Sequence, residues 1–193
     1  MLINPNGFRE YDARWKYPEE INLPGMTYLG LGLGTQIRLH GVEPVIAVGN
    51  DYRDYSVSIK NALIIGLMQA GIHVKDIGPA LSPMAYFAQF HLDASAVAMV
   101  TASHNPNGWT GVKMGFDRPL THGPDEMSEL KDIVLNGKVK TFSGGHYEFI
   151  DGVKDAYLND LVGDFQMTRS LKVVCATGNG TASAFAPELF QRI

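Results

Sequence analysis

The chain has 193 residues, of which 45% are hydrophobic and 19% charged, and its net charge is −4. This composition excludes a disordered chain, which would be poor in apolar residues and rich in charge. The 16 basic residues form no basic run, and 20 acidic residues outnumber them, so no nucleic-acid partner is expected. The single cysteine, the lack of a membrane-length apolar run and the N-terminal residues predict a cytoplasmic protein without a membrane partner.

Blocks of apolar residues with strand-like and helix-like spacing alternate along the chain. The first 25 residues are rich in Pro, Gly, Asn and charge, and they predict an ordered loop or arm. After this arm, the pattern predicts helices over 27–40, 55–70, 82–91 and 124–136, and strands over 44–49, 72–77, 96–100 and 112–116. The strand at 96–100 is uniformly apolar and is expected in the centre of a sheet. The alternation predicts an α/β layered domain over residues 1–150.

Three glycines, Gly30, Gly32 and Gly34, lie within the first predicted helix. They superficially resemble a dinucleotide-binding loop, but they follow no predicted strand and lack the G-x-G-x-x-G spacing. Small residues at a close helix contact are the favoured interpretation.

The C-terminal part of the chain predicts a helix near 151–163, a strand over 171–176 and a helix over 180–192. One strand and one helix cannot bury both of their faces alone. Residues 151–193 are therefore expected to be a linker helix and the incomplete start of a second α/β/α domain. The chain is expected to be a fragment of a longer protein, with Cys175 buried in the strand.

A polar loop follows the central strand and carries the best candidates for chemistry. Ser103, His104 and Asn105 lie at the carboxyl end of this strand, where open α/β sheets bind ligands. A hydrolase nucleophile elbow, G-x-S-x-G, is excluded because Thr101 and Asn105 replace its glycines. A phosphoserine is favoured, since backbone amides, Lys113 and a metal would stabilise its charge. The alternative is a structural turn in which the Ser103 and His104 side chains only make hydrogen bonds within the turn.

Asp51 and Arg53 follow the first predicted strand. They are candidates for ligand binding, but an ion pair that stabilises the turn is the favoured interpretation.

Five segments in order carry a family resemblance. Thr101–Pro106 matches a T-[AG]-S-H-N-P motif, and Gly111-Val112-Lys113 follows at the expected spacing. The other segments are Phe8–Arg14, Val48–Arg53, Asp76–Ala88 and Val173–Gly180. Together they resemble the N-terminal part of the α-D-phosphohexomutases, the phosphomannomutase/phosphoglucomutase family.

The resemblance implies a three-layer α/β/α fold with a mixed, mostly parallel sheet, whereas the alternation alone would predict an all-parallel one. It also implies phosphotransfer between O1 and O6 of mannose or glucose phosphates, through a phosphoserine and a hexose 1,6-bisphosphate. The catalytic residues that it implies are Ser103 as phosphoserine, Lys113 for proton transfer, Arg14 for charge stabilisation and His104 for positioning or proton transfer. The substrate-binding residues that it implies are Arg9, Tyr11, Thr101 and Asn105.

The resemblance implies Mg²⁺ as cofactor, with hexose 1,6-bisphosphate as activator. The family's D-G-D-G-D-R metal loop is absent from this sequence, so only Ser103, through its phosphate, would contact the metal, and the remaining ligands would lie outside this chain. The expected partners are small hexose phosphates and the missing C-terminal domains of the same polypeptide, and the 193 residues alone are expected to be inactive. Phosphoglucosamine mutase, or a degenerate phosphosugar-binding module, remains an alternative.

Overall fold

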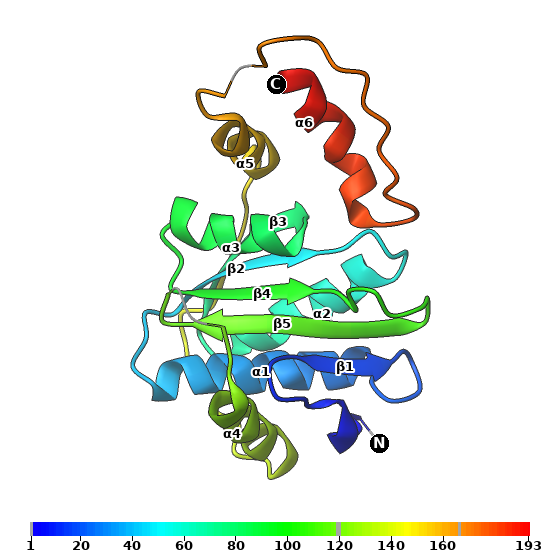
Figure 1. Ribbon diagram of the computed structural model, residues 1–193. Coiled ribbons are helices and arrows are strands. Elements are labelled where there is room, and N and C mark those ends of the chain that lie inside the picture. Colours follow the sequence, from blue (N-terminus) through cyan, green and yellow to red (C-terminus); the bar gives the residue numbers. More distant parts are fainter. Residues whose placement is uncertain (1, 119–120, 166) are drawn as a thin grey trace.

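The computed structural model describes residues 2–118, 121–165 and 167–193 and contains a six-stranded sheet (Figure 1). Its strand order is β1-β5-β4-β2-β3-β6. Parallel pairing joins β4, β2, β3 and β6, whereas β5 runs antiparallel to both β4 and β1. The strands are β1 (Ala13–Lys16), β2 (Val45–Asn50), β3 (His73–Pro79), β4 (Ala96–Val100), β5 (Trp109–Phe116) and β6 (His146–Phe149). The mixed sheet is confirmed.

Helices lie on both sides of this sheet (Figure 1). One side carries α1 (Leu23–Leu39), α2 (Ser56–Gln69) and α4 (Pro124–Leu135). The other side carries α3 (Ser82–His91), with α5 (Val153–Val162) and α6 (Ala186–Arg192) beyond it. Two 3₁₀ turns complete the described elements, Pro5–Gly7 and Thr181–Ala184. The predicted three-layer α/β/α architecture is therefore confirmed.

The central strands are apolar on both faces because each face meets a helical layer. In β2, Ile46 and Val48 join the core under α1 and α2, while Ala47 joins the core under α3. All five residues of β4 are buried, which confirms the central position predicted for 96–100. These two strands hold the candidate loop at a fixed edge of the sheet.

The glycines of α1 lie where α1 crosses its neighbours. A Cβ atom on Gly30 would come within 2.1 Å of the Leu63 carbonyl oxygen in α2. A Cβ on Gly34 would come within 2.5 Å of the Ala70 methyl group. The close helix contact predicted from the sequence is confirmed.

Both edge strands of the sheet differ from the sequence prediction. The predicted N-terminal arm contains β1, and β6 was not predicted. The sequences ARWK and HYEF mix charged, polar and aromatic residues, so their strand conformation depends on pairing with a neighbour. The predicted strand over 112–116 also begins earlier, at Trp109.

The prediction of a strand over 171–176 is wrong. These residues have no regular secondary structure, and Val174 is 87% exposed. Cys175 is also exposed, contrary to the buried position expected for it. An extended segment becomes a strand only when a second strand satisfies its backbone groups, and no described strand pairs with this one. The predicted helix over 180–192 is divided at Phe185 into a 3₁₀ turn and α6.

The domain boundary near residue 150 stays a prediction. Within the described ranges, no helix combines the length and the apolar character needed to cross a membrane.

Candidate active site

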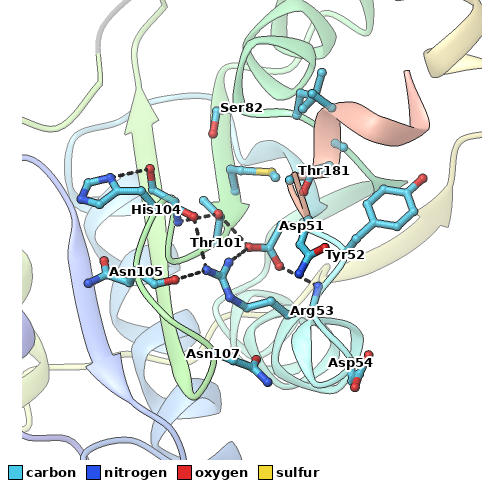
Figure 2. A pocket seen from close by; sticks show the side chains of 17 residues that line it. Asp51, Tyr52, Arg53, Asp54, Ser82, Thr101, His104, Asn105, Asn107 and Thr181 are labelled. Carbon is cyan, nitrogen blue, oxygen red and sulfur yellow. Dashed lines mark hydrogen bonds and ion pairs between the residues drawn. The ribbon is translucent and has the colours of Figure 1, made fainter. Parts of the chain in front are cut away.

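The β4–β5 loop lies at the carboxyl edge of the sheet, beside the turns that follow β2 and β3. Parallel strands bring their carboxyl ends to one edge, so these three connections converge there. They border a cavity of about 860 Å³, which segment 179–182 closes on another side (Figure 2). Ser103 and His104 both line this cavity.

Ser103 is exposed and has a left-handed backbone conformation, with φ of +55°. Residues with a side chain adopt this conformation at a cost, so contacts around the loop must hold it. The Ser103 Oγ lies 3.5 Å from His104 Nδ1. The hydroxyl is therefore presented to solvent on a constrained turn, beside an imidazole.

Two basic side chains lie on the neighbouring strands, on the α3 side of the sheet. Ala13 and Trp15 of β1 are buried in the core under α1, so the alternation of the strand places Arg14 on the opposite face. The Arg14 Nη1 donates to Asn105 Oδ1 at 2.6 Å, which ties β1 to the Ser103 loop. Lys113 lies on the adjacent strand β5.

The Asp12 carboxylate lies between the Arg14 and Lys113 side chains, and Asp12 was not predicted as a site residue. Arg14 donates to its Oδ2 through Nε and Nη2 at 2.9 and 2.8 Å, and Lys113 Nζ lies 4.0 Å from the same oxygen. Burial raises the pKa of the Tyr86 phenol, and the Asp12 carboxylate raises it further. Asp12 directly precedes β1, two residues before Arg14, and this spacing was the sequence signal for the contact between them.

The predicted substrate-binding residues occupy different positions. Asn105 joins the Arg14 cluster, and Thr101 is buried beneath the loop. Arg9 and Tyr11 are exposed on the turn before β1, where the Arg9 N–H donates to the Asp12 carbonyl. No hydrogen bond between described residues joins either side chain to the Ser103 loop.

The favoured interpretation of Asp51 and Arg53 is confirmed, since the two side chains form an ion pair. Figure 2 shows this pair beside the loop that carries Thr101, His104 and Asn105. Arg53 Nη2 donates to the carbonyl of Asn105 at 2.7 Å. The sequence indicated the pair but gave no signal that it supports the loop.

A metal site is not complete in the described residues, because no cluster of three or more His, Cys, Asp or Glu side chains is arranged to hold an ion. The Asp51 carboxylate is already occupied by hydrogen bonds and the Arg53 guanidinium.

An exposed serine on a constrained turn, at the carboxyl edge of an α/β/α sheet and near two cations, is typical of proteins that handle phosphate. Comparison with known sequences gives the family. The profile "Phosphoglucomutase/phosphomannomutase, alpha/beta/alpha domain I" matches residues 5–140, so the chain belongs to the phosphoglucomutase/phosphomannomutase family.

Individual relatives agree with this assignment. The chain is 31% identical over 186 residues to the phosphomannomutase/phosphoglucomutase of Pseudomonas putida, covering 96% of the chain and 39% of that protein. It is 36% identical over 164 residues to a probable phosphoglucosamine mutase of Pyrococcus furiosus, covering 83% of the chain and 35% of that protein. The chain thus spans less than two fifths of the length of these relatives.

A solved structure of a phosphoglucomutase/phosphomannomutase family protein from Burkholderia thailandensis superimposes with a TM-score of 0.90 at 31% identity. The superposition covers 99% of this chain and 43% of that one. A putative phosphomannomutase of Thermus thermophilus superimposes with a TM-score of 0.71 at 27% identity, over 82% of this chain and 36% of its own.

Proposed function

We propose that the polypeptide carrying this chain is a hexose-phosphate mutase and that Ser103 carries its phosphoryl group. The observation that supports this most directly is the exposed Ser103, held on a left-handed turn whose neighbouring residues Ala102 and Asn105 accept hydrogen bonds from Arg14. The named relatives are mutases of mannose, glucose or glucosamine phosphates, so hexose phosphates are the proposed substrates.

The proposed reaction moves a phosphoryl group from Ser103 to a sugar hydroxyl. The bond between phosphorus and Ser103 Oγ breaks, a bond from phosphorus to the sugar oxygen forms, and the hydroxyl proton moves to Oγ. The resulting hexose 1,6-bisphosphate returns its other phosphoryl group to Ser103 by the reverse step. Bond rearrangement in such transfers depends mainly on positioning and on nearby positive charge.

Arg14 supplies permanent positive charge in this proposal because its guanidinium stays protonated. Lys113 supplies a second cation and a proton donor on the same face, and His104 positions the Ser103 hydroxyl or its proton. Substrate contacts by Arg9, Tyr11 and Asn105 remain part of the proposal, as does a Mg²⁺ ion bound mainly outside this chain. Residues 1–193 alone are proposed to be inactive, and the location is proposed to be cytoplasmic.

The test is to map phosphate on the full-length polypeptide. The protein and its Ser103→Ala variant are incubated with Mg²⁺ and glucose 1,6-bisphosphate, digested, and analysed by peptide mass spectrometry. We expect phosphate on Ser103 and its transfer to glucose or mannose 6-phosphate. An unmodified Ser103 in well-folded, metal-loaded protein would contradict the mutase and favour a phosphosugar-binding module.

The second candidate is a phosphoglucosamine mutase, which the similarity to the Pyrococcus protein favours. Offering glucosamine 6-phosphate beside glucose and mannose 6-phosphates to the phosphorylated protein distinguishes the two. Preferential transfer to the amino sugar would select this candidate.

A further inference from the structure

We propose that Asp51 is a positioning residue that fixes the backbone of Ser103 through Thr101 and Arg53. The proposal rests on the proposed function, in which Ser103 carries the phosphoryl group. It concerns the turn after β2, whose part in that chemistry the sequence motifs leave open.

Asp51 is 4% exposed, and its two carboxylate oxygens are occupied. Ser56 Oγ donates to Oδ1 at 2.5 Å, and the Arg53 N–H donates to the same oxygen at 3.2 Å. Thr101 Oγ1 donates to Oδ2 at 2.8 Å, and the Arg53 guanidinium pairs with this oxygen too. All of these contacts are to residues of the protein, so the Asp51 carboxylate serves to hold its neighbouring side chains in position.

The Thr101 hydroxyl connects the Asp51 carboxylate to the backbone of Ser103. A carboxylate only accepts hydrogen bonds, so the Thr101 proton must point toward Asp51. The Thr101 oxygen is then left to accept, and the Ser103 N–H donates to it at 2.9 Å. Asp51 therefore sets the direction of the hydroxyl that holds the Ser103 amide.

Arg53 acts on the carbonyl side of the same residue. Its Nη2 lies within hydrogen-bond distance of two carbonyl oxygens, that of Ser103 at 3.3 Å and that of Asn105 at 2.7 Å. The N–H and the C=O of Ser103 are thus both linked to one buried carboxylate, each through one intermediate side chain. These two anchors, on either side of the Ser103 Cα, account for the positive φ at a residue that is not glycine.

This arrangement also gives Thr101 a role different from the substrate contact expected for it. Thr101 is 8% exposed, and its hydroxyl both donates and accepts within the protein. A positioning residue affects the rate of transfer, whereas a substrate contact affects the apparent affinity for substrate.

Thr101→Val, Thr101→Ser and Asp51→Asn in the full-length polypeptide test the proposal. Thr110→Val is the matched control, because Thr110 is 1% exposed and its hydroxyl has no hydrogen-bond partner among the described residues. The first readout is kcat and KM for phosphoryl transfer between Ser103 and glucose 6-phosphate. The second readout is the hydrogen exchange rate of the Ser103 amide, which needs no substrate.

We expect Thr101→Val to lower kcat about 10- to 100-fold, the range for a misplaced reacting group. KM should stay within about threefold of the wild-type value, because binding contacts are retained. Exchange at the Ser103 amide should accelerate. Thr101→Ser should restore both properties, and Thr110→Val should leave them unchanged. In the double variant Asp51→Asn/Thr101→Val, the decrease in log kcat should be smaller than the sum of the decreases in the two single variants. The effects are not additive because both residues act through the same series of hydrogen bonds.

Wild-type kcat and wild-type exchange in Thr101→Val would overturn the proposal. A raised KM with unchanged kcat would also overturn it, by making Thr101 a substrate contact. If the wild-type protein takes no phosphate at Ser103, the proposed function fails instead. The exchange rates in the four single variants and the double variant then still decide whether Asp51 and Thr101 fix the Ser103 amide.

Discussion

Asp12 sets the relative positions of the two cations at the candidate site. It receives two hydrogen bonds from Arg14 and lies 4.0 Å from the Lys113 ammonium group. A planar guanidinium makes both contacts to Asp12 and a third to Asn105, which a lysine ammonium cannot do from one position. Arg14 therefore supplies geometry as well as charge.

Replacing Arg14 with lysine should separate these two contributions. We expect Arg14→Lys to slow phosphoryl transfer from Ser103 about 10- to 100-fold, because the charge stays but the forked contacts are lost. The free energy of unfolding should also fall, by about 0.5–3 kcal/mol, because the Arg14 side chain is only 11% exposed and loses hydrogen bonds to Asp12 and Asn105. Single-turnover transfer to glucose 6-phosphate measures the effect. Arg38→Lys, at a residue that lies over the Phe142 ring at 5.0 Å, is the control; equal rates in both variants would contradict the forked-contact role.

His122 is a buried titratable residue that follows β5 and is not among the candidate site residues. It is 1% exposed, its Nε2 lies 2.9 Å from Gln36 Oε1, and its Nδ1 has no partner among the described residues. Burial lowers the pKa of His122 to about 4, although Glu126 and Glu129 raise it partially. The neutral imidazole is therefore the form that the folded protein holds.

This lowered pKa predicts how stability depends on pH. In the unfolded chain His122 takes up a proton near pH 6.5, while in the folded protein it does so only near pH 4. The contribution of His122 to the free energy of unfolding is thus complete above pH 6.5 and declines as the pH falls toward 4, by up to about 3 kcal/mol. Urea unfolding at pH 7.5, 6.5 and 5.0 measures the decline, and His122→Gln should remove part of it. Identical pH profiles for the two proteins would contradict a buried, neutral His122.

At the scale of the elements, α1 and α2 approach each other through glycine. Gly30 meets the Leu63 carbonyl of α2, and Gly66 of α2 meets the Thr27 carbonyl of α1, at 2.1 and 1.9 Å from an added Cβ. Both carbonyl groups are backbone atoms, so a side chain at either glycine could be accommodated only if the two helices moved apart.

Gly30→Ala should therefore destabilise the protein, although alanine favours helices. We expect the free energy of unfolding to fall by about 1–3 kcal/mol or more, which is the usual effect of overpacking a core. Gly123→Ala is the matched control, because its Cβ would meet only the end of the Glu126 side chain at 3.1 Å. Chemical denaturation compares the two variants; equal stability would show that the helices separate without cost.

Strands buried on both faces could be predicted from the sequence, and edge strands could not. The run at 96–100 is apolar throughout because both helical layers cover it, and its bounds in the structure agree with the prediction. The apolar run at 171–176 has a similar pattern but no pairing partner in the described chain, so it is not a strand. The polar β6 is a strand because β3 pairs with it. Whether a partner is present is not encoded in the local pattern.

The same distinction applies to the candidate site. The loop from Thr101 to Lys113 could be recognised because its residues are contiguous. The contacts of Asp51, Arg53 and Asp12 with this region could not, because the pairing of β2 with β4 and of β1 with β5 creates them. The sequence predicted the groups proposed to react, and the pairing of the strands brings the residues that contact their loop into place.

At the scale of the whole molecule, Phe185 attaches the C-terminal segment to the α/β/α layers. Its ring is 3% exposed and packs in the core under α3, edge-on to Tyr52 at 6.4 Å. Arg192 adds hydrogen bonds to Asn159 and Asp155 of α5, each at 2.6 Å. One buried aromatic side chain and a few polar contacts thus hold a segment that also borders the cavity.

Phe185→Ala should release this segment without unfolding the sheet. Removing a buried phenylalanine ring costs about 3–5 kcal/mol, which exceeds what the remaining surface contacts are expected to supply. Hydrogen exchange should therefore accelerate across 178–193 and stay unchanged in β2 and β4. Phe190→Ala is the control, since Phe190 is 45% exposed. Faster exchange throughout the sheet would instead show that the segment stabilises the whole fold.

The position of Ser103 also determines when the candidate site can form during folding. Strands β4 and β5 form a local antiparallel hairpin around the loop, but Thr101 and Asp51 are 50 residues apart and Arg53 and Asn105 are 52 apart. Contacts over such separations incur loop-closure entropy and form slowly compared with a hairpin. A folding intermediate with only the hairpin would carry Ser103 on an unconstrained loop. In the proposed function, Ser103 would therefore become a competent phosphoryl acceptor only when β2 pairs with β4, and its chemistry would be acquired together with the central parallel sheet.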